Sequence, residues 1–147
     1  MRFKQILASV LTVACLFTCF TATASAQDAS TYSTDYGIAP IYNIATSVSS
    51  TLNFIGTTAE CESQADGIDT VKITVVQTLQ KYSGWFWIWN DVDGATWTRT
   101  ENRNTINLMN TKSGLPSGKY RVKSVFTLTN SSGKTETLTI YSDTEKI

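Results

Sequence analysis

All four tryptophans of the chain lie in one short segment, residues 81–100: Trp85, Trp87, Trp89 and Trp97. If this segment is a strand, the first three indoles point to one face, while Phe86 and Ile88 point to the other. Because a β-sandwich core is only about 10 Å thick, we expect the smaller pair inside and the indoles outside. An outward row of indoles is an apolar contact surface, and it also suits stacking on sugar rings. The alternative is that the leader, a neighbouring strand or a second copy of the chain covers this face.

Carboxylates are the other side chains near this segment that could do chemistry. Residues 91–94 read Asp-Val-Asp-Gly, which matches part of a calcium loop, but Trp89 and Thr100 stand where further ligands are needed. We therefore expect an Asp-Gly turn that ends the tryptophan strand. Pairs of acids could also hydrolyse glycosides, and the candidates are Glu60, Glu62, Asp91, Asp93 and Glu101. No spacing among them singles out a pair.

The chain contains no histidine. This absence excludes Ser-His-Asp and Cys-His mechanisms, most zinc sites and the commonest general base at neutral pH. The sequence also lacks a phosphate-cradling glycine loop and a G-x-S-x-G motif. We therefore expect no catalytic residue, no metal and no cofactor, and a small secreted hydrolase is the least favoured reading.

The first 26 residues have the features of a secretory signal peptide. Arg2 and Lys4 precede the apolar run 6–20, and the small residues Ala24 and Ala26 stand where a signal peptidase reads. The apolar run is too short for a comfortable membrane span, although a retained anchor is the alternative. We predict cleavage after Ala26 and a secreted protein, with association with the cell wall as a further option.

Cleavage would leave a leader, residues 27–40, and one domain, residues 41–147. The leader is rich in Ser, Thr, Asp and Ala, so we expect it to be flexible. Loss of Arg2 and Lys4 leaves 12 − 2 = 10 basic against 12 acidic residues, a net charge near −2. This balance argues against non-specific binding to nucleic acid or to an anionic membrane, because both need a basic surface.

Cys61 is the only cysteine that remains after cleavage, since Cys15 and Cys19 lie in the signal peptide. A lone cysteine forms no internal disulfide, so the apolar core must hold the domain together. We expect Cys61 to be a small buried residue, and a reactive or cross-linking thiol is the alternative.

The domain has the alternation and the turn residues of a β protein, with Thr, Val and Ile abundant throughout. About seven short strands predict an antiparallel β-sandwich. We expect turns at Gly56 and at Ala65–Gly67, and a bulge near Val75–Gln77 in the long strand that follows. Before that bulge, three apolar side chains should face one way: Val71, Ile73 and Val75.

The segment 114–125, GLPSGKYRVKSV, resembles the corner that enters the penultimate strand of immunoglobulin-like and fibronectin-type sandwiches, with four matching positions: Leu115, Gly118, Tyr120 and Val122. The resemblance implies that the tyrosine hydroxyl binds the corner's backbone. It also implies that Val122 points into the core, where antibody domains carry a cysteine bonded to the second strand. Cys61 would then pack near Val122 without a partner. Only Gly118 of the four adopts a left-handed turn at low cost.

The whole mature chain also resembles a group of small secreted proteins of Gram-positive bacteria, classed as a domain of unknown function. The matching features are Cys61 and the segments 79–81, 84–85, 118–124 and 135–142. The resemblance implies secretion and the sandwich fold, and it carries over no catalytic residue. We therefore expect a secreted, non-enzymatic binding module for an extracellular protein or cell-surface component. A carbohydrate-binding module that uses the tryptophan row is the alternative.

Overall fold

The computed structural model describes residues 42–147 and the two-residue strand β1 (Ser30–Thr31). The predicted signal peptide, its cleavage after Ala26 and the rest of the predicted leader lie outside the described residues. Ser30–Thr31 belong to that leader and pair in parallel with Leu138–Thr139, which the composition of the leader does not predict.

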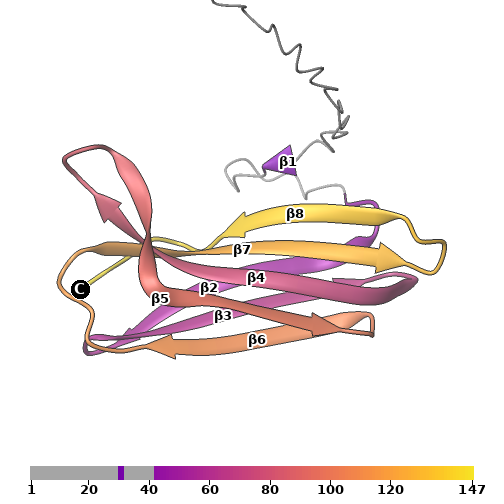
Figure 1. Ribbon diagram of the computed structural model, residues 1–147, viewed down its shortest axis with the longest axis horizontal. Coiled ribbons are helices and arrows are strands. Elements are labelled where there is room, and N and C mark those ends of the chain that lie inside the picture. Colours follow the sequence, from indigo (N-terminus) through magenta and orange to yellow (C-terminus); the bar gives the residue numbers. More distant parts are fainter. Residues whose placement is uncertain (1–29, 32–41) are drawn as a thin grey trace, which may run out of the picture.

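The described residues form an antiparallel immunoglobulin-like β-sandwich, which confirms the predicted fold (Figure 1). One sheet has the order β1-β8-β7-β4-β5, with β9 also on β7, and the other has the order β2-β3-β6. The long strands are β2 (Ala45–Ile55), β3 (Thr58–Gly67), β4 (Thr70–Ser83), β5 (Ile88–Glu101), β6 (Thr105–Lys112), β7 (Lys119–Asn130) and β8 (Thr135–Tyr141), and β9 is Glu145–Lys146.

The inward face of each long strand follows from its alternation. Along β7, every second residue is buried: Tyr120, Val122, Ser124, Phe126 and Leu128. In β2, Leu52 is buried, and Val48 and Phe54 pack against the core beside it. A one-residue slip in either strand would turn these side chains to solvent, so burial fixes the register.

The long strand β4 departs from its predicted pattern. Val71 is exposed because the pairing with β7 shifts between Thr70 and Lys72, which leaves Val71 as the extra residue of a bulge. The bulge predicted near Val75–Gln77 is wrong, since pairing with β7 runs without a break from Lys72 to the end of the ladder.

Two turns can be compared with their predictions. Gly56 ends β2 in a left-handed conformation, with φ 61°, as its position predicts. The turn predicted at Ala65–Gly67 is wrong by a few residues, because β3 continues through Gly67 and the chain reverses at Ile68–Asp69. Asp69 takes the left-handed conformation there, with φ 52°.

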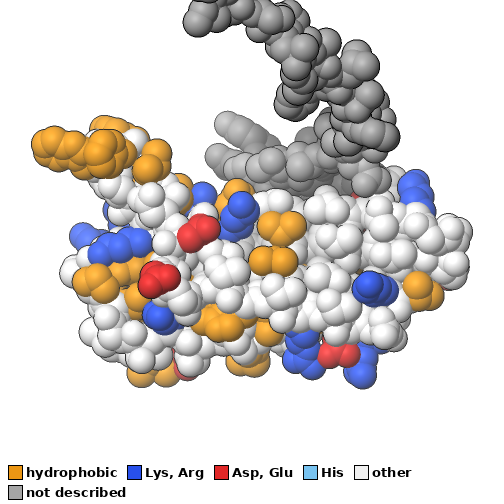
Figure 2. All heavy atoms as spheres, in the orientation of Figure 1, with side chains coloured by type: hydrophobic (Ala, Val, Ile, Leu, Met, Phe, Trp, Pro, Cys, Tyr) orange, Lys and Arg blue, Asp and Glu red, His pale blue; other side chains and the backbone are white. Residues whose placement is uncertain are grey.

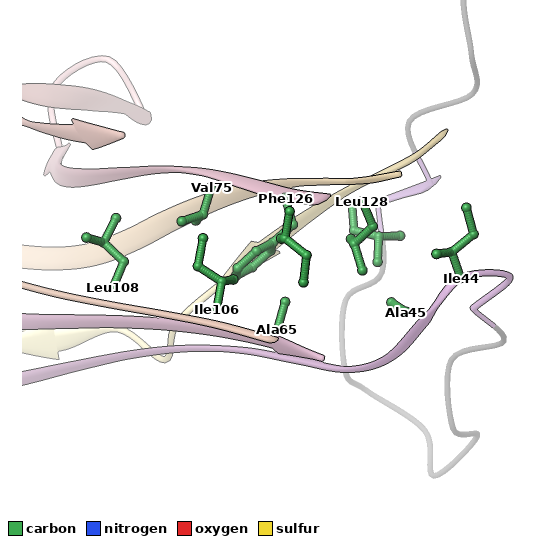
Figure 3. Close-up of a cluster of buried hydrophobic side chains, with 10 residues drawn as sticks. Ile44, Ala45, Ala65, Val75, Ile106, Leu108, Phe126 and Leu128 are labelled. Atoms are coloured by element: carbon green, nitrogen blue, oxygen red, sulfur yellow. The ribbon is translucent and has the colours of Figure 1, made fainter. Parts of the chain in front are cut away.

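The core contains two apolar clusters. The first surrounds Phe126 and Leu128 and includes Ala65, Val75 and Ile106, which Figure 3 shows between the two sheets. The second contains eight residues: Leu52, Ala59, Cys61, Leu79, Ala95, Leu115, Tyr120 and Val122. Cys61 therefore shares a buried cluster with Val122, as the resemblance implies, and its burial confirms the prediction for this thiol. Burial raises the pKa of Cys61 to about 12.

A row of polar side chains, here called the polar belt, lies between the two clusters: Ser50, Ser63, Gln77, Asn110 and Ser124. On β4, β3 and β7 the belt residue stands between one member of each cluster, as Gln77 does between Val75 and Leu79. Gln77 Nε2 donates to Ser63 Oγ at 2.7 Å and to the Leu108 carbonyl at 3.2 Å, and Gln77 Oε1 accepts from Asn110. Ser124 Oγ is hydrogen-bonded to both remaining serines of the belt, at 2.7 and 2.8 Å. The polar belt therefore connects the two sheets through a network of hydrogen bonds.

The predicted corner is present. The Tyr120 hydroxyl donates to the Pro116 carbonyl at 2.5 Å, and Leu115 is buried in the same cluster as the tyrosine ring. The left-handed residue is Gly114, with φ 72°, and not Gly118 as predicted. A Cβ on Gly118 would lie 2.6 Å from Lys81 Cε, so a larger residue there would displace the end of that flexible side chain.

The carboxylate of Glu136 on β8 holds the start of β2. Its two oxygens accept the backbone N–H groups of Asn43, Ile44 and Ala45 at 2.8–2.9 Å. Burial raises the pKa of Glu136, but the backbone donors outweigh it and the net pKa is lowered. A lowered folded pKa stabilises the fold above the unfolded pKa, and this stability is lost as pH falls through the folded pKa.

We expect Glu136→Gln to lower the free energy of unfolding at pH 7 by about 1–2 kcal/mol. The change replaces one carboxylate oxygen, which accepts backbone N–H groups, by an amide NH2 group, which can only donate. Urea unfolding at pH 7 and pH 3 measures the effect. The difference in unfolding free energy between variant and wild type should narrow at pH 3, because the Glu136 carboxyl of the unfolded wild type takes up a proton there. An equal difference in unfolding free energy at both pH values would show that the charge of the Glu136 carboxylate does not stabilise the fold.

Candidate functional site

The tryptophan segment forms a hairpin turn and not a continuous strand. β4 ends at Ser83, β5 begins at Ile88, and residues 84–87 make the turn between them. Trp85 and Trp87 therefore lie in the turn, and only Trp89 of the predicted row lies in a strand. The expected row of three indoles on one strand face is wrong, because an apolar run predicts a strand while the Ser83–Ile88 pairing closes a turn.

The end of this hairpin is strongly apolar and exposed. Four consecutive residues, here called the apolar tip, have high exposed fractions: Trp85 87%, Phe86 67%, Trp87 82% and Ile88 48%. Figure 2 shows their hydrophobic surface gathered at the end of the hairpin that rises from the sandwich at the upper left. Patches of this kind mark contact sites on soluble proteins. Trp85 and Trp87 are exposed as predicted, but the inward placement predicted for Phe86 and Ile88 is wrong, because both lie at the exposed end of the hairpin.

Trp87 adopts an uncommon backbone conformation, with φ 57°. This left-handed region suits glycine, and a bulky side chain there costs of order 1 kcal/mol or more. Gly84, in the same turn, meets no atom within 4 Å of an added Cβ, so the turn has open space around it. Trp87 thus places an exposed indole at a backbone position where glycine would adopt the same conformation without strain.

The stem of the hairpin is braced by a stacked group of side chains on its outer face. The Tyr82 and Trp89 rings face each other across the stem, with centroids 5.3 Å apart. The Arg121 guanidinium lies 4.3 Å from the Trp89 ring centroid and 4.0 Å from that of Tyr141. Trp89 is therefore a packing residue that ties the hairpin to β7 and β8, at the worth of about 1 kcal/mol per cation–π contact.

Hydrogen bonds continue this brace toward the body of the domain. Arg121 Nε donates to Gln80 Oε1 at 2.9 Å, and Gln80 Nε2 donates to Asp91 Oδ1 at 2.8 Å. Gln80 is buried. Its side-chain amide therefore finds its hydrogen-bonding partners within the protein, namely the Arg121 guanidinium and the Asp91 carboxylate. Burial lowers the pKa of Arg121, while Tyr141 raises it. These hydrogen bonds anchor the base of the stem through Gln80 on β4 and Asp91 on β5.

The segment Asp91–Gly94 lies within β5 and does not end a strand, which corrects the prediction of a turn there. Pairing with β4 shifts from Gln80–Asp91 to Thr78–Thr96, so residues 92–95 of β5 stand opposite Leu79 alone. Gly94 takes φ 63° in this irregular stretch. The interruption separates the stem from the rest of β5, and the hairpin departs from the sheet there (Figure 1).

Trp97 lies apart from the apolar tip. It is half-buried on β5 and packs against both core clusters. It is therefore a structural residue that covers the edge of the core. The four tryptophans serve two roles: two are exposed at the tip, and two pack on the domain.

A pocket of about 400 Å³ lies at the base of the hairpin. It is bounded by stem residues, including Lys81 and Asn90, and by Leu115 and Pro116 of the corner. The Lys81 ammonium lies 5.5 Å from the centroid of the Tyr120 ring at its inner end. The pocket is open and holds one cation and one carboxylate, that of Asp91.

The acidic residues considered for catalysis are divided between the two sheets, and two of them, Glu60 and Glu62, line one open pocket on β3. Glu62 accepts from Asn107, and Glu101 binds Arg99 and Arg103. Asp91 and Asp93 lie on β5, whereas Glu60 and Glu62 lie on β3 in the other sheet. Within residues 42–147, no group of three His, Cys, Asp or Glu side chains is placed to hold a metal ion.

No protein-family model matches this chain. No curated protein is significantly similar in sequence. Among the described residues, no helix has the length and apolar character needed to cross a membrane. The apolar tip is thus the candidate functional site on structural grounds alone.

Proposed function

We propose that this chain is a secreted, non-enzymatic binding module, and that the apolar tip is its contact element. The carrying observation is the exposure of four consecutive apolar side chains at the end of a hairpin. The predicted signal peptide and the resemblance to secreted proteins of Gram-positive bacteria support an extracellular location. The partner is a protein or another component of a cell surface.

The energetics of the tip support a contact role. Full burial of one large apolar side chain contributes about 1.5–3 kcal/mol, so the tip residues together could supply micromolar binding. The braced stem holds them in place before contact, which lowers the entropy lost on binding. Within residues 84–88, only the two indole N–H groups are polar side-chain groups. This composition gives less support to a sugar platform, which needs hydrogen-bonding groups beside the stacking rings.

The test compares two double variants, each of which replaces two exposed apolar side chains by serine. We expect Trp85→Ser/Trp87→Ser to reduce binding of the protein to washed bacterial cells and cell-wall fractions by at least about tenfold. The matched control is Ile68→Ser/Met109→Ser, which removes two apolar side chains of 66% and 69% exposure away from the tip. The control should bind like the wild type. Equal binding by the wild type and both variants would refute the role of the tip.

A further inference from the structure

We propose that the partner of the apolar tip is the interface of a lipid bilayer, into which the hairpin inserts shallowly. This inference rests on the proposed function and names its partner. It concerns a peripheral contact by a hairpin and not a membrane span. The observations that carry it are the order of side-chain types along the hairpin and the balance of charge around its stem.

The side chains of the hairpin change character in layers from the tip to the base. The apolar tip comes first, with Trp85, Phe86 and Trp87 the most exposed. The next complete cross-strand pair is Tyr82–Trp89, whose rings have a polar group on an apolar body. The pair Lys81–Asn90 follows, and then Gln80–Asp91 with Arg121. The interface of a bilayer becomes steadily more polar from the hydrocarbon boundary toward water, and the hairpin presents the same gradient from tip to base.

The spacing of these layers also fits a bilayer surface. Strand residues advance about 3.3 Å each, so the charged level lies roughly 10 Å behind the apolar tip. The polar zone between hydrocarbon and water is about 5–8 Å deep on each side of a membrane. A turn leaves backbone N–H and C=O groups outside the strand ladder, and these groups are costly in hydrocarbon. Insertion should therefore stop with the indoles at the interface, where tryptophan is favoured.

The charges near the stem nearly balance, so attraction to anionic lipid is not the driving force. Lys81, Lys112 and Arg121 stand against Asp91 and Asp93 around the base of the hairpin. After the predicted cleavage, the chain carries 12 − 2 = 10 basic and 12 acidic residues. The proposal therefore commits to a zwitterionic surface, with little dependence on salt.

A convex tip distinguishes this partner from a protein pocket. Protein contacts of standard size bury about 800 Å² per partner and surround their apolar centre with a polar rim. The apolar tip projects from the body of the sandwich at the end of a hairpin (Figure 2). A bilayer accepts an apolar projection of any shape, whereas a protein needs a matching hollow for two indoles.

Vesicles of phosphatidylcholine, alone and with one part in five of phosphatidylglycerol, provide the test. The protein is expressed as the full chain and purified as the host exports it, so that all variants share one N-terminus. We expect tryptophan emission to shift to shorter wavelength with both vesicle types, and the shift to persist at 0.5 M NaCl. Trp85→Ser/Trp87→Ser should lower the partition coefficient roughly 100-fold, because two indoles leave the interface. Ile68→Ser/Met109→Ser should partition like the wild type.

Three outcomes would overturn the inference. They are no binding to either vesicle, binding only to phosphatidylglycerol vesicles with loss at high salt, and equal binding by wild type and tip variant. If vesicles fail while tip-dependent binding to cells persists, the proposed function stands and the partner is a surface protein or glycan. If both are lost, the proposed function fails as well.

Discussion

Replacing Tyr120 with alanine should lower the free energy of unfolding by about 3–5 kcal/mol, a large share of a domain's total stability. The phenol ring is fully buried and contacts the Phe54 ring edge-on, with centroids 5.6 Å apart. Its hydroxyl closes the corner through the Pro116 carbonyl. Alanine empties this volume and leaves that carbonyl without its donor, so both costs add.

Tyr120→Phe separates the two contributions. It keeps the packed volume and removes one hydrogen bond, so the expected loss is about 1 kcal/mol. Urea unfolding followed by tryptophan fluorescence measures both variants, and cell binding of Tyr120→Phe should match the wild type. A Tyr120→Phe protein of normal stability that no longer binds would place this tyrosine in a functional site instead.

Gln77→Leu should destabilise the domain by about 2–3 kcal/mol, although it makes the core more apolar. Gln77 is fully buried, and its amide binds Ser63, Asn110 and the Leu108 carbonyl. Within the described residues, no buried side-chain nitrogen or oxygen lacks a partner. Leucine would leave several members of the polar belt unsatisfied at once.

The same belt predicts strong non-additivity. Adding Ser63→Ala and Ser124→Ala to Gln77→Leu removes two of the three belt hydroxyls along with their partner, so the triple variant should lose less stability than the sum of the single variants. The coupling should be about 1 kcal/mol or more in equilibrium unfolding. A Gln77→Leu variant that is more stable than the wild type would show that the belt is not needed to hold the two sheets together.

The sandwich and the corner follow from local sequence, because alternation and turn residues act over a few positions. Tyr120 and Val122 point inward as their pattern requires. Gln77 could not be placed in this way, because an inward glutamine is stable only when partners on other strands satisfy it. Its position therefore depends on contacts with β3 and β6 that the sequence of β4 does not contain.

The sequence predicts that the tryptophan segment forms an exposed apolar site, but it does not predict that the exposed residues lie in a hairpin turn. Residues 85–89 alternate in a way that is compatible with a strand, so the pattern placed Trp85, Trp87 and Trp89 on one face. The turn at residues 84–87 arises because Tyr82 pairs with Trp89 and Arg121 stacks on that indole. The bulge at residues 92–95 likewise depends on pairing between strands. Exposure of the tip is thus a consequence of tertiary contacts at the stem.

The most direct test of a contact role for the apolar tip uses one environment-sensitive dye at two positions. Phe86→Cys and Met109→Cys each add an exposed thiol, one at the tip and one on β6 of the other sheet. Cys61 stays unlabelled because it is buried and burial raises its pKa to about 12. Each labelled protein is mixed with washed cells, and dye emission and bound fraction are read together. We predict that bound protein carries a blue-shifted, brighter dye at position 86 and an unchanged dye at position 109. Binding that leaves the dye at position 86 in water would contradict the contact role of the tip.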